Sequence, residues 1–317
     1  AATRRSHIRA RAPISMQYFS TDSRSPEATS REAVLRGQPD DKGLYFPASI
    51  PKLPDGFIAG LNSRSNEETA FDVIRPYVGG TIPDDKLFHI CEETVNFPLP
   101  LVTITDQISA LELFHGPTLA FKDVGARFMS RCLRHFSTER EAKTIVLVAT
   151  SGDTGGAVAN GFHNVEGIEV IILYPKGRVS KVQELQLTTL GGNVTTLELR
   201  GSFDECQAIA KRALADAELQ KQAFITSANS INVARWLPQQ FYYFYAIKQW
   251  KAARRQLSQC LAETSAIWRP AFSRIFPVCR LLDLSLRATQ TTLCRSFSKQ
   301  VIIGPNLQFR RSRTQWT

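Results

Sequence analysis

Lys122 is the side chain of this 317-residue chain whose setting best suits covalent chemistry. It lies in the run LELFHGPTLAFKDVGARF, directly after Phe121 and before an Asp123–Val124–Gly125 turn. Partial burial lowers the pKa of a lysine, so that its neutral amine can attack an aldehyde. Such a lysine suits a Schiff base with pyridoxal phosphate. The alternative is a surface lysine at a helix start, with its stem along the protein.

A glycine-rich segment, ATSGDTGGAVANGF (149–162), follows the apolar run TIVLVAT. Backbone N–H groups of such a turn, at the start of a helix, bind anions. The hydroxyls of Ser151 and Thr154 add further donors. The segment therefore predicts a phosphate or carboxylate site. The alternative is an ordinary strand–helix turn in which Asp153 or Thr154 caps the helix.

A third polar cluster lies in ITSANSINVAR (225–235), after an expected strand and before an expected helix. It contains Asn229, Ser230, Asn232 and Arg235. Open α/β folds bind ligands beyond the carboxyl ends of their strands, which is where this loop would lie. Here too the alternative is a helix cap.

These segments require a regular scaffold, which the sequence provides from about residue 110. Apolar strands are expected at 110–116, 144–150, 169–175 and 193–199. Helices are expected at 121–136, from Ser180, at 203–219 and at 231–250, the last with Pro238 near its start or at a kink. The alternation predicts parallel α/β structure with buried strands. Residues 16–60 are turn-rich, and residues 66–100 mix helices with loops.

Five motifs in order, FHGPTLAFKD, TSGDTGGAVA, YPKGRVSKVQ, QLTTLGGNV and SANSINVAR, resemble threonine synthase. The openings MQYFSTDS and GLYFP resemble the same family, so the resemblance covers about residues 16–250. It implies an α/β fold similar to the tryptophan-synthase-β group of pyridoxal-phosphate enzymes, with open parallel sheets. It also implies a lyase of threonine biosynthesis that converts O-phosphohomoserine and water to threonine and phosphate.

The resemblance also implies residue roles. Lys122 would form the aldimine with pyridoxal phosphate and then move protons at the substrate's α and β carbons. The cofactor-binding residues would be Lys122 with Ser151, Gly152, Asp153, Thr154 and Gly155. Ser227, Asn229, Ser230, Asn232 and Arg235 would bind substrate from the same cleft. Its phosphate would be held by Lys176, Arg178, Ser180 and Lys181, for which the alternative is a solvated loop.

Residues 252–317 depart from the family pattern. They contain one glycine, Gly304, against seventeen in residues 1–251, and ten arginines. The family has a glycine-rich loop for the cofactor's phosphate, VPSGNFGN, where this chain has CLAETSAIWRP (260–270). One permitted coding of that segment, read one base earlier, gives VPSGNFGNLAA. With permitted codings, the same step can give NANDTVPEFLQT from 289–300 and TGNYRPKPSVPTLSNAMD from 300–317.

We therefore interpret 252–317 as a frameshifted, poorly packed tail on a truncated α/β domain. The chain as written is then expected to have little or no activity. The other predicted segments are an upstream or transit-like extension (1–15), an N-terminal domain (16–100) and the pyridoxal-phosphate α/β domain (101–251). The competing interpretation of 252–317 is a genuine arginine-rich tail.

Charge and cysteine content limit the other function classes. The net charge of +10 arises from +4 in residues 1–15 and +9 in 252–317, which leaves −3 for 16–251. Because the basic ends have the explanations given above, nucleic-acid binding is not expected. No run suits a membrane helix, and the six scattered cysteines show no metal-ligand spacing, so no metal and a reduced, cytoplasmic chain are expected. The remaining alternatives are a related pyridoxal-phosphate amino-acid dehydratase and a non-catalytic remnant whose basic tail binds an acidic partner.

Overall fold

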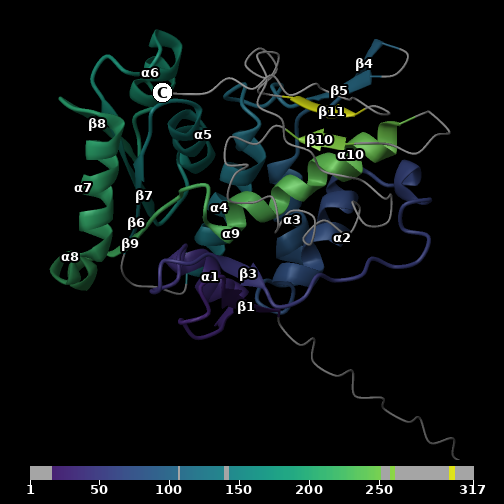
Figure 1. The fold of residues 1–317 in the computed structure, drawn as a ribbon, viewed down its shortest axis with the longest axis horizontal. Helices are drawn as coiled ribbons and strands as arrows, with labels where there is room; N and C mark the ends of the chain where they lie inside the picture. Colours follow the sequence, from purple (N-terminus) through teal and green to yellow (C-terminus); the bar gives the residue numbers. More distant parts are fainter. Residues whose placement is uncertain (1–15, 106–107, 139–142, 251–257, 261–299, 304–317) are drawn as a thin grey trace, which may run out of the picture.

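The computed structural model describes residues 16–105, 108–138, 143–250, 258–260 and 300–303. Figure 1 shows an N-terminal part beside a parallel α/β part. The N-terminal elements are β1 (Gln17–Ser20), β2 (Ala28–Thr29), α1 (Ser30–Arg36), β3 (Tyr45–Pro47), the 3-10 turn η1 (Leu61–Ser63), α2 (Asn66–Val78) and α3 (Asp84–Thr94). Strand β1 pairs antiparallel with β2 and β3 in a three-stranded sheet.

The parallel sheet has the strand order β8-β7-β6-β9. Its strands are β6 (Thr144–Ala149), β7 (Ile168–Pro175), β8 (Val194–Leu199) and β9 (Phe224–Thr226). The connecting helices are α5 (Asp153–Phe162), α6 (Lys181–Thr188), α7 (Phe203–Ala215) and α8 (Ala217–Gln222). All three strand pairings are parallel, which confirms the α/β prediction.

Both faces of this sheet are covered. Side chains alternate along a strand, so Val146 and Val148 of β6 join the main core with α5, while Leu147 and Ala149 pack with α7. In Figure 1, α7 and α5 accordingly lie on opposite sides of β6 and β7. Burial on both faces explains why these strands are almost continuously apolar in sequence.

Helix α4 (Lys122–Ser137) lies at the centre of the molecule. It packs against α5, α3, α9 and α1. Its buried residues, among them Val124, Phe128 and Leu133, belong to a core that runs from Tyr18 to Ala246. The proposed division at residues 100/101 therefore crosses one continuous core, and it stays a prediction.

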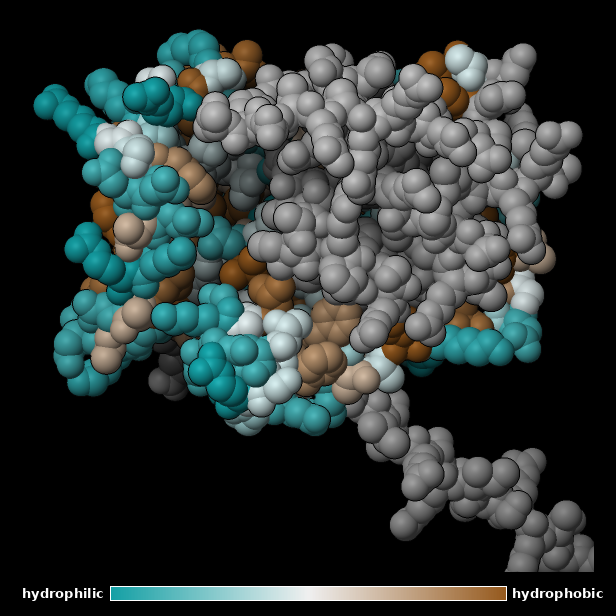
Figure 2. Space-filling model, viewed as in Figure 1, coloured by the Kyte–Doolittle hydropathy of each residue, from teal (hydrophilic) through white to brown (hydrophobic). Residues whose placement is uncertain are grey.

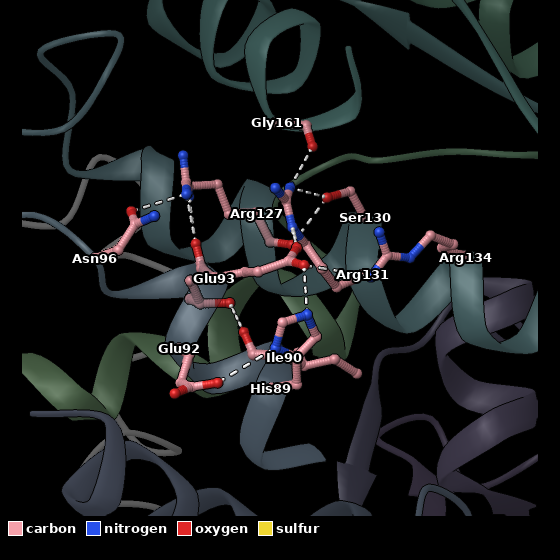
Figure 3. Close-up of polar contacts among 11 residues, drawn as sticks. His89, Ile90, Glu92, Glu93, Asn96, Arg127, Ser130, Arg131, Arg134 and Gly161 are labelled. Carbon is pink, nitrogen blue, oxygen red and sulfur yellow. Dashed lines mark hydrogen bonds and ion pairs between the residues drawn. The ribbon is translucent and has the colours of Figure 1, made fainter. Parts of the chain in front are cut away.

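Arginines of α4 attach this helix to its neighbours, as Figure 3 shows. Arg127 Nε donates to the carbonyl of Glu93, near the end of α3, at 2.9 Å. Arg131 Nη1 donates to the carbonyl of Gly161, near the end of α5, at 2.7 Å. Arg131 Nε also reaches the Glu93 carboxylate at 2.7 Å. Cations thus satisfy carbonyls at the carboxyl ends of two helices.

Two helices differ from the sequence prediction. The expected helix 203–219 is two helices, because the Asp216 side chain accepts from the backbone of Glu218 and Leu219 and so begins α8. The expected helix 231–250 consists of α9 (Val233–Trp236), the 3-10 turn η2 (Leu237–Gln240) and α10 (Phe241–Gln249). Pro238 lies in η2 near the start, where a missing N–H costs least.

A second four-stranded sheet has the order β10-β11-β5-β4. It contains β4 (Leu101–Thr105), β5 (Ile108–Glu112), β10 (Ser258–Cys260) and β11 (Gln300–Ile303), all paired antiparallel. Strands β10 and β11 are thus the parts of 252–317 that the structure describes. The expected poor packing of the tail stays a prediction, because 252–257, 261–299 and 304–317 lie outside the described residues, as do 1–15.

The described surface is mostly polar around α7 and α8, at the left edge of Figure 2. Large apolar side chains are nevertheless exposed near α6, namely Leu119 (55%), Val182 (65%) and Leu185 (46%). Among the described helices, none combines the length and apolar character that crossing a bilayer requires.

Candidate functional site

Lys122 is the first residue of α4, and its side chain is buried with 8% of its surface exposed. Its Nζ donates to Thr154 Oγ1 at 3.0 Å and lies 5.7 Å from the ring centre of Phe121. The alternative of a surface lysine is therefore wrong. The structure brings together one residue from each of the first two motifs, 32 positions apart in the chain.

The start of α4 is fixed from several sides. The Tyr242 hydroxyl donates to the carbonyl of Phe121. Gly125 lies directly against the carbonyl of Arg235, and a Cβ at this position would come within 2.4 Å of that oxygen. Only glycine permits so close an approach of α4 to α9. These contacts hold the backbone that carries Lys122.

Asp123 faces the loop before the helix. Its carboxylate accepts from the Thr118 N–H at 3.0 Å and from the Thr118 hydroxyl. Burial raises the pKa of Asp123, and the hydrogen bonds from Thr118 oppose that rise only in part. Asp123 thus orders the PTLAF loop next to Lys122.

The loop between β6 and α5 is organised by Thr150. Its Oγ1 accepts from the N–H groups of Gly152 at 3.2 Å and Gly155 at 2.9 Å. Gly152 is the N-cap of α5, and no side chain caps that helix. The alternative in which Asp153 or Thr154 caps α5 is therefore wrong. Thr150 accepts from the first-turn N–H of Gly155, whereas no described side chain accepts from the N–H groups of Asp153 and Thr154, which lie at the positive end of the helix dipole.

The glycines of this loop are explained by the packing of neighbouring groups. A Cβ on Gly155 would lie 2.4 Å from Thr150 Cγ2 and 2.9 Å from Leu187 Cδ2 of α6. A Cβ on Gly152 would lie 3.0 Å from Gln183 Nε2. Helix α6 therefore lies directly over the first turn of α5. Ser151, at the tip of the loop, is exposed.

In the loop 227–232, the helix-cap alternative is right for Asn232. Its side chain accepts from the Ala234 N–H and donates to the Val34 carbonyl, both at 2.9 Å, so it joins α9 to α1. Asn229 and Ser230 are half-buried, and the Asn229 carbonyl accepts from the Asn232 N–H at 3.0 Å.

Two further side chains of this region are polar and buried. Arg235, 1% exposed, donates from Nη1 to the Ala228 carbonyl at 2.6 Å. Burial lowers the pKa of Arg235 to about 10. Its position supports the loop from within the core rather than at a surface. Ser227 Oγ is buried without a hydrogen-bond partner among the described residues, so it has capacity for one.

The PKGRVSK residues have local partners. Lys176 pairs with Glu198 at 3.2 Å, and Lys181 pairs with Glu184 at 3.1 Å. Arg178 is exposed. Ser180 caps α6 in a capping box with Gln183. These contacts fit the solvated-loop alternative, and phosphate binding by the four residues stays a prediction.

Sequence reasoning missed two glutamines that connect α6 to the site. Gln183 Nε2 donates to Asp153 Oδ1 at 2.8 Å, and Gln186 Nε2 donates to the Thr118 carbonyl at 3.2 Å. A serine followed three residues later by glutamine is a capping-box signal, which could have drawn attention to Gln183. Nothing in the local sequence indicates its contact with Asp153.

Comparisons with known proteins agree with this architecture. Residues 17–95 match the family model described as threonine synthase N terminus, and residues 104–258 match the model of pyridoxal-phosphate dependent enzymes. The threonine synthase of Haemophilus influenzae is 43% identical over 229 residues, covering 72% of this chain and 53% of the relative. That of Escherichia coli is 38% identical over 234 residues, covering 74% of this chain and 54% of the relative.

Solved structures give the same result. A threonine synthase from Brucella melitensis, described as bound to PLP, matches with a TM-score of 0.75 and 35% identity over 83% of this chain and 58% of its own. The Escherichia coli threonine synthase matches with a TM-score of 0.74 and 34% identity, over 82% and 61%. The chain thus spans about half the length of its curated relatives. Through residues 17–258, the chain belongs to the threonine synthase family of pyridoxal-phosphate-dependent enzymes.

Proposed function

We propose that the site around Lys122 serves the threonine synthase reaction, in which O-phosphohomoserine and water give threonine and phosphate. One observation carries the proposal. The buried amine of Lys122 lies 3.0 Å from Thr154 Oγ1, in the first turn of α5, where the N–H groups of Asp153 and Thr154 have no side-chain acceptor among the described residues. A nucleophilic amine and an anion-binding helix start are the two features that a phosphorylated aldehyde requires.

The described residues fit pyridoxal phosphate as the cofactor. Lys122 would hold its aldehyde carbon, and the backbone of the segment from Ser151 to Gly155 would face an anionic group of cofactor or substrate. The buried hydroxyl of Ser227 has hydrogen-bonding capacity to contribute. When bound, the cofactor supplies an electron sink for negative charge at the substrate's α carbon.

The chain's own residues would act around that group. Lys122 moves protons at the α and β carbons of the substrate, and Thr154 orients its amine through their hydrogen bond. Asn229 and Ser230 would bind substrate. Asn232 and Arg235 would hold the loop that carries them. Lys176, Arg178, Ser180 and Lys181 remain our candidates for its phosphate.

We further propose that residues 252–317 are a shifted reading frame and that the chain as written has little or no turnover. The family's glycine-rich phosphate loop is the segment that the shift would replace. Without those N–H donors the cofactor's phosphate loses much of its electrostatic stabilisation.

The test compares the chain as written with one in which a single base restores the frame near codon 251. Each is assayed with pyridoxal phosphate for threonine and phosphate released from O-phosphohomoserine. The restored chain should release both in equal amounts, and Lys122→Ala in the restored chain should lower kcat at least a thousandfold. The unaltered chain should show below about 1% of the restored rate, since it lacks an electrostatic group worth about a hundredfold or more.

Two other results would contradict these proposals. A restored chain that forms only 2-oxobutyrate from threonine would favour a dehydratase. Equal turnover by the unaltered chain would contradict the proposal that residues 252–317 are a shifted reading frame. Sequencing codons 245–260 tests the shift directly. The cytoplasmic location stays part of this proposal, and the free, buried Cys91, Cys132 and Cys206 agree with a reducing compartment.

A further inference from the structure

Gln183 uses both ends of its amide at once. Its Oε1 accepts from the N–H of Ser180 at 3.2 Å and from the Ser180 hydroxyl at 3.0 Å, which completes the capping box of α6. Its Nε2 donates to Asp153 Oδ1 at 2.8 Å. Gly152 leaves room for this amide, since a Cβ there would lie 3.0 Å from Nε2.

A capping box accepts glutamate as readily as glutamine at this position. The four boxes in the described residues differ in this respect, because those of α1, α2 and α7 use Glu32, Glu68 and Glu205. Only an amide can cap α6 and also donate to a carboxylate. The choice of glutamine at position 183 is therefore explained by Asp153 and not by the cap.

Asp153 is the first residue of α5 and directly precedes Thr154, which contacts Lys122. A carboxylate at this position has a competing option. Aspartate near a helix start readily accepts from first-turn N–H groups, and it is stabilised there by the helix dipole. If Asp153 turned back in this way, its charge would occupy the place of an anionic ligand.

We propose that Gln183 is a positioning residue that holds the Asp153 carboxylate toward α6 and so keeps the first turn of α5 open for an anionic group of cofactor or substrate. The same bond fixes the turn from which Thr154 reaches Lys122. The inference rests on the proposed function, because it concerns the site that the cofactor would use. A second contact, from Gln186 to the Thr118 carbonyl at 3.2 Å, holds α6 in this position.

The variant Gln183→Glu separates the two roles of the side chain. Glutamate keeps the capping box, but it faces Asp153 with a second carboxylate instead of an amide donor. Pyridoxal phosphate is added to the full chain, and borohydride then reduces each imine between the cofactor and a lysine to a stable amine. Peptide mapping then gives the rate of incorporation at Lys122. The matched control is Glu205→Gln, which makes the reverse exchange in the capping box of α7.

At pH 8, Gln183→Glu should lower the rate of incorporation at Lys122 at least fivefold, with a Tm close to that of the wild type. The ratio of variant to wild-type rate should recover as pH falls toward 5, because two facing carboxylates then share a proton. Adding Asp153→Asn should also restore the ratio, since an asparagine amide can donate to the new carboxylate. The double variant is compared with Asp153→Asn alone, in which Gln183 keeps an acceptor, so that any effect of the change at position 153 itself is accounted for.

The outcomes separate the two proposals. A Gln183→Glu chain that is labelled as fast as wild type at pH 8 would overturn the role of Gln183 alone. A loss without recovery in the double variant, accompanied by a lower Tm, would reduce Gln183 to a structural residue. A wild-type chain in which Lys122 is labelled no faster than other lysines would overturn the proposed function as well.

Discussion

At the scale of single residues, Lys122 is positioned by a close approach between the backbones of two helices. Lys122 is held where α4 begins, and the beginning of α4 is held by Gly125 against the Arg235 carbonyl. The sequence places Gly125 beside the lysine but cannot show that α9 packs there. Positions 125 and 235 are far apart in the sequence, and the local pattern of apolar residues does not show which distant segments pack together.

Gly125→Ala should lower the free energy of unfolding by about 2–3 kcal/mol, although alanine is the better helix former by about 1 kcal/mol. The new Cβ would lie 2.4 Å from a backbone oxygen that cannot rotate away. Urea unfolding followed by circular dichroism measures the change. Gly60→Ala is the control, because the nearest atom to its Cβ would be 3.6 Å away. Equal stability of Gly125→Ala and wild type would show that α4 and α9 do not pack this closely.

At the scale of elements, the strands and helices that build the sheet follow from sequence because burial on both faces leaves continuous apolar runs. The predicted strand at 144–150 and helix at 121–136 are confirmed by β6 and α4. The short strands β1, β2 and β3 have two to four residues each, too few for a period to show. The break between α7 and α8 depends on the cap formed by Asp216.

The sequence predicts several residues of the site but not the contacts between them. Lys122 and the loop before α5 were identified from residue type and neighbours. Their contact through Thr154, and the support from Gln183, depend on how α4, α5 and α6 pack. Asn232 and Arg235 were expected at the ligand, whereas their hydrogen bonds place them in the support of the loop. Polarity alone does not distinguish a ligand contact from a satisfied buried group.

The contact between α3 and α4 has a predictable response to pH. Burial raises the pKa of Glu93, but the hydrogen bond and charge of Arg131, followed by the charges of Arg134 and His89, lower it below the ordinary value. Because the pKa is lower in the folded state, the stabilisation is present above the unfolded pKa, about 4.3. It is lost as pH falls through the folded pKa.

Glu93→Gln should therefore reduce the free energy of unfolding by about 1 kcal/mol at pH 7, since its side chain is 26% exposed and partly screened. The difference from wild type should shrink as pH falls from about 5 to 3. Urea unfolding across this range measures it, with the exposed Glu166 changed to Gln as the control. A difference that is constant with pH would argue against an ionised Glu93 in this contact.

At the scale of the whole molecule, a family scaffold is present through residues 17–258 while the chain spans about half the length of its curated relatives. The scaffold already contains the lysine, the helix start that faces it and the elements that hold both. Exposed apolar residues around α6, such as Leu119 and Val182, lie beside this site. Labelling of Lys122 can therefore be measured on this chain independently of turnover.

We propose that, among the lysines of this chain, the fold prepares the amine of Lys122 for pyridoxal phosphate. The most direct test adds the cofactor to the full chain, reduces with borohydride, and maps all modified lysines by mass spectrometry. We predict that Lys122 is labelled at least tenfold faster than any exposed lysine, such as Lys143, and that prior unfolding in urea removes this preference. Uniform labelling of the folded chain, with Lys122 protected by its burial, would contradict this proposal.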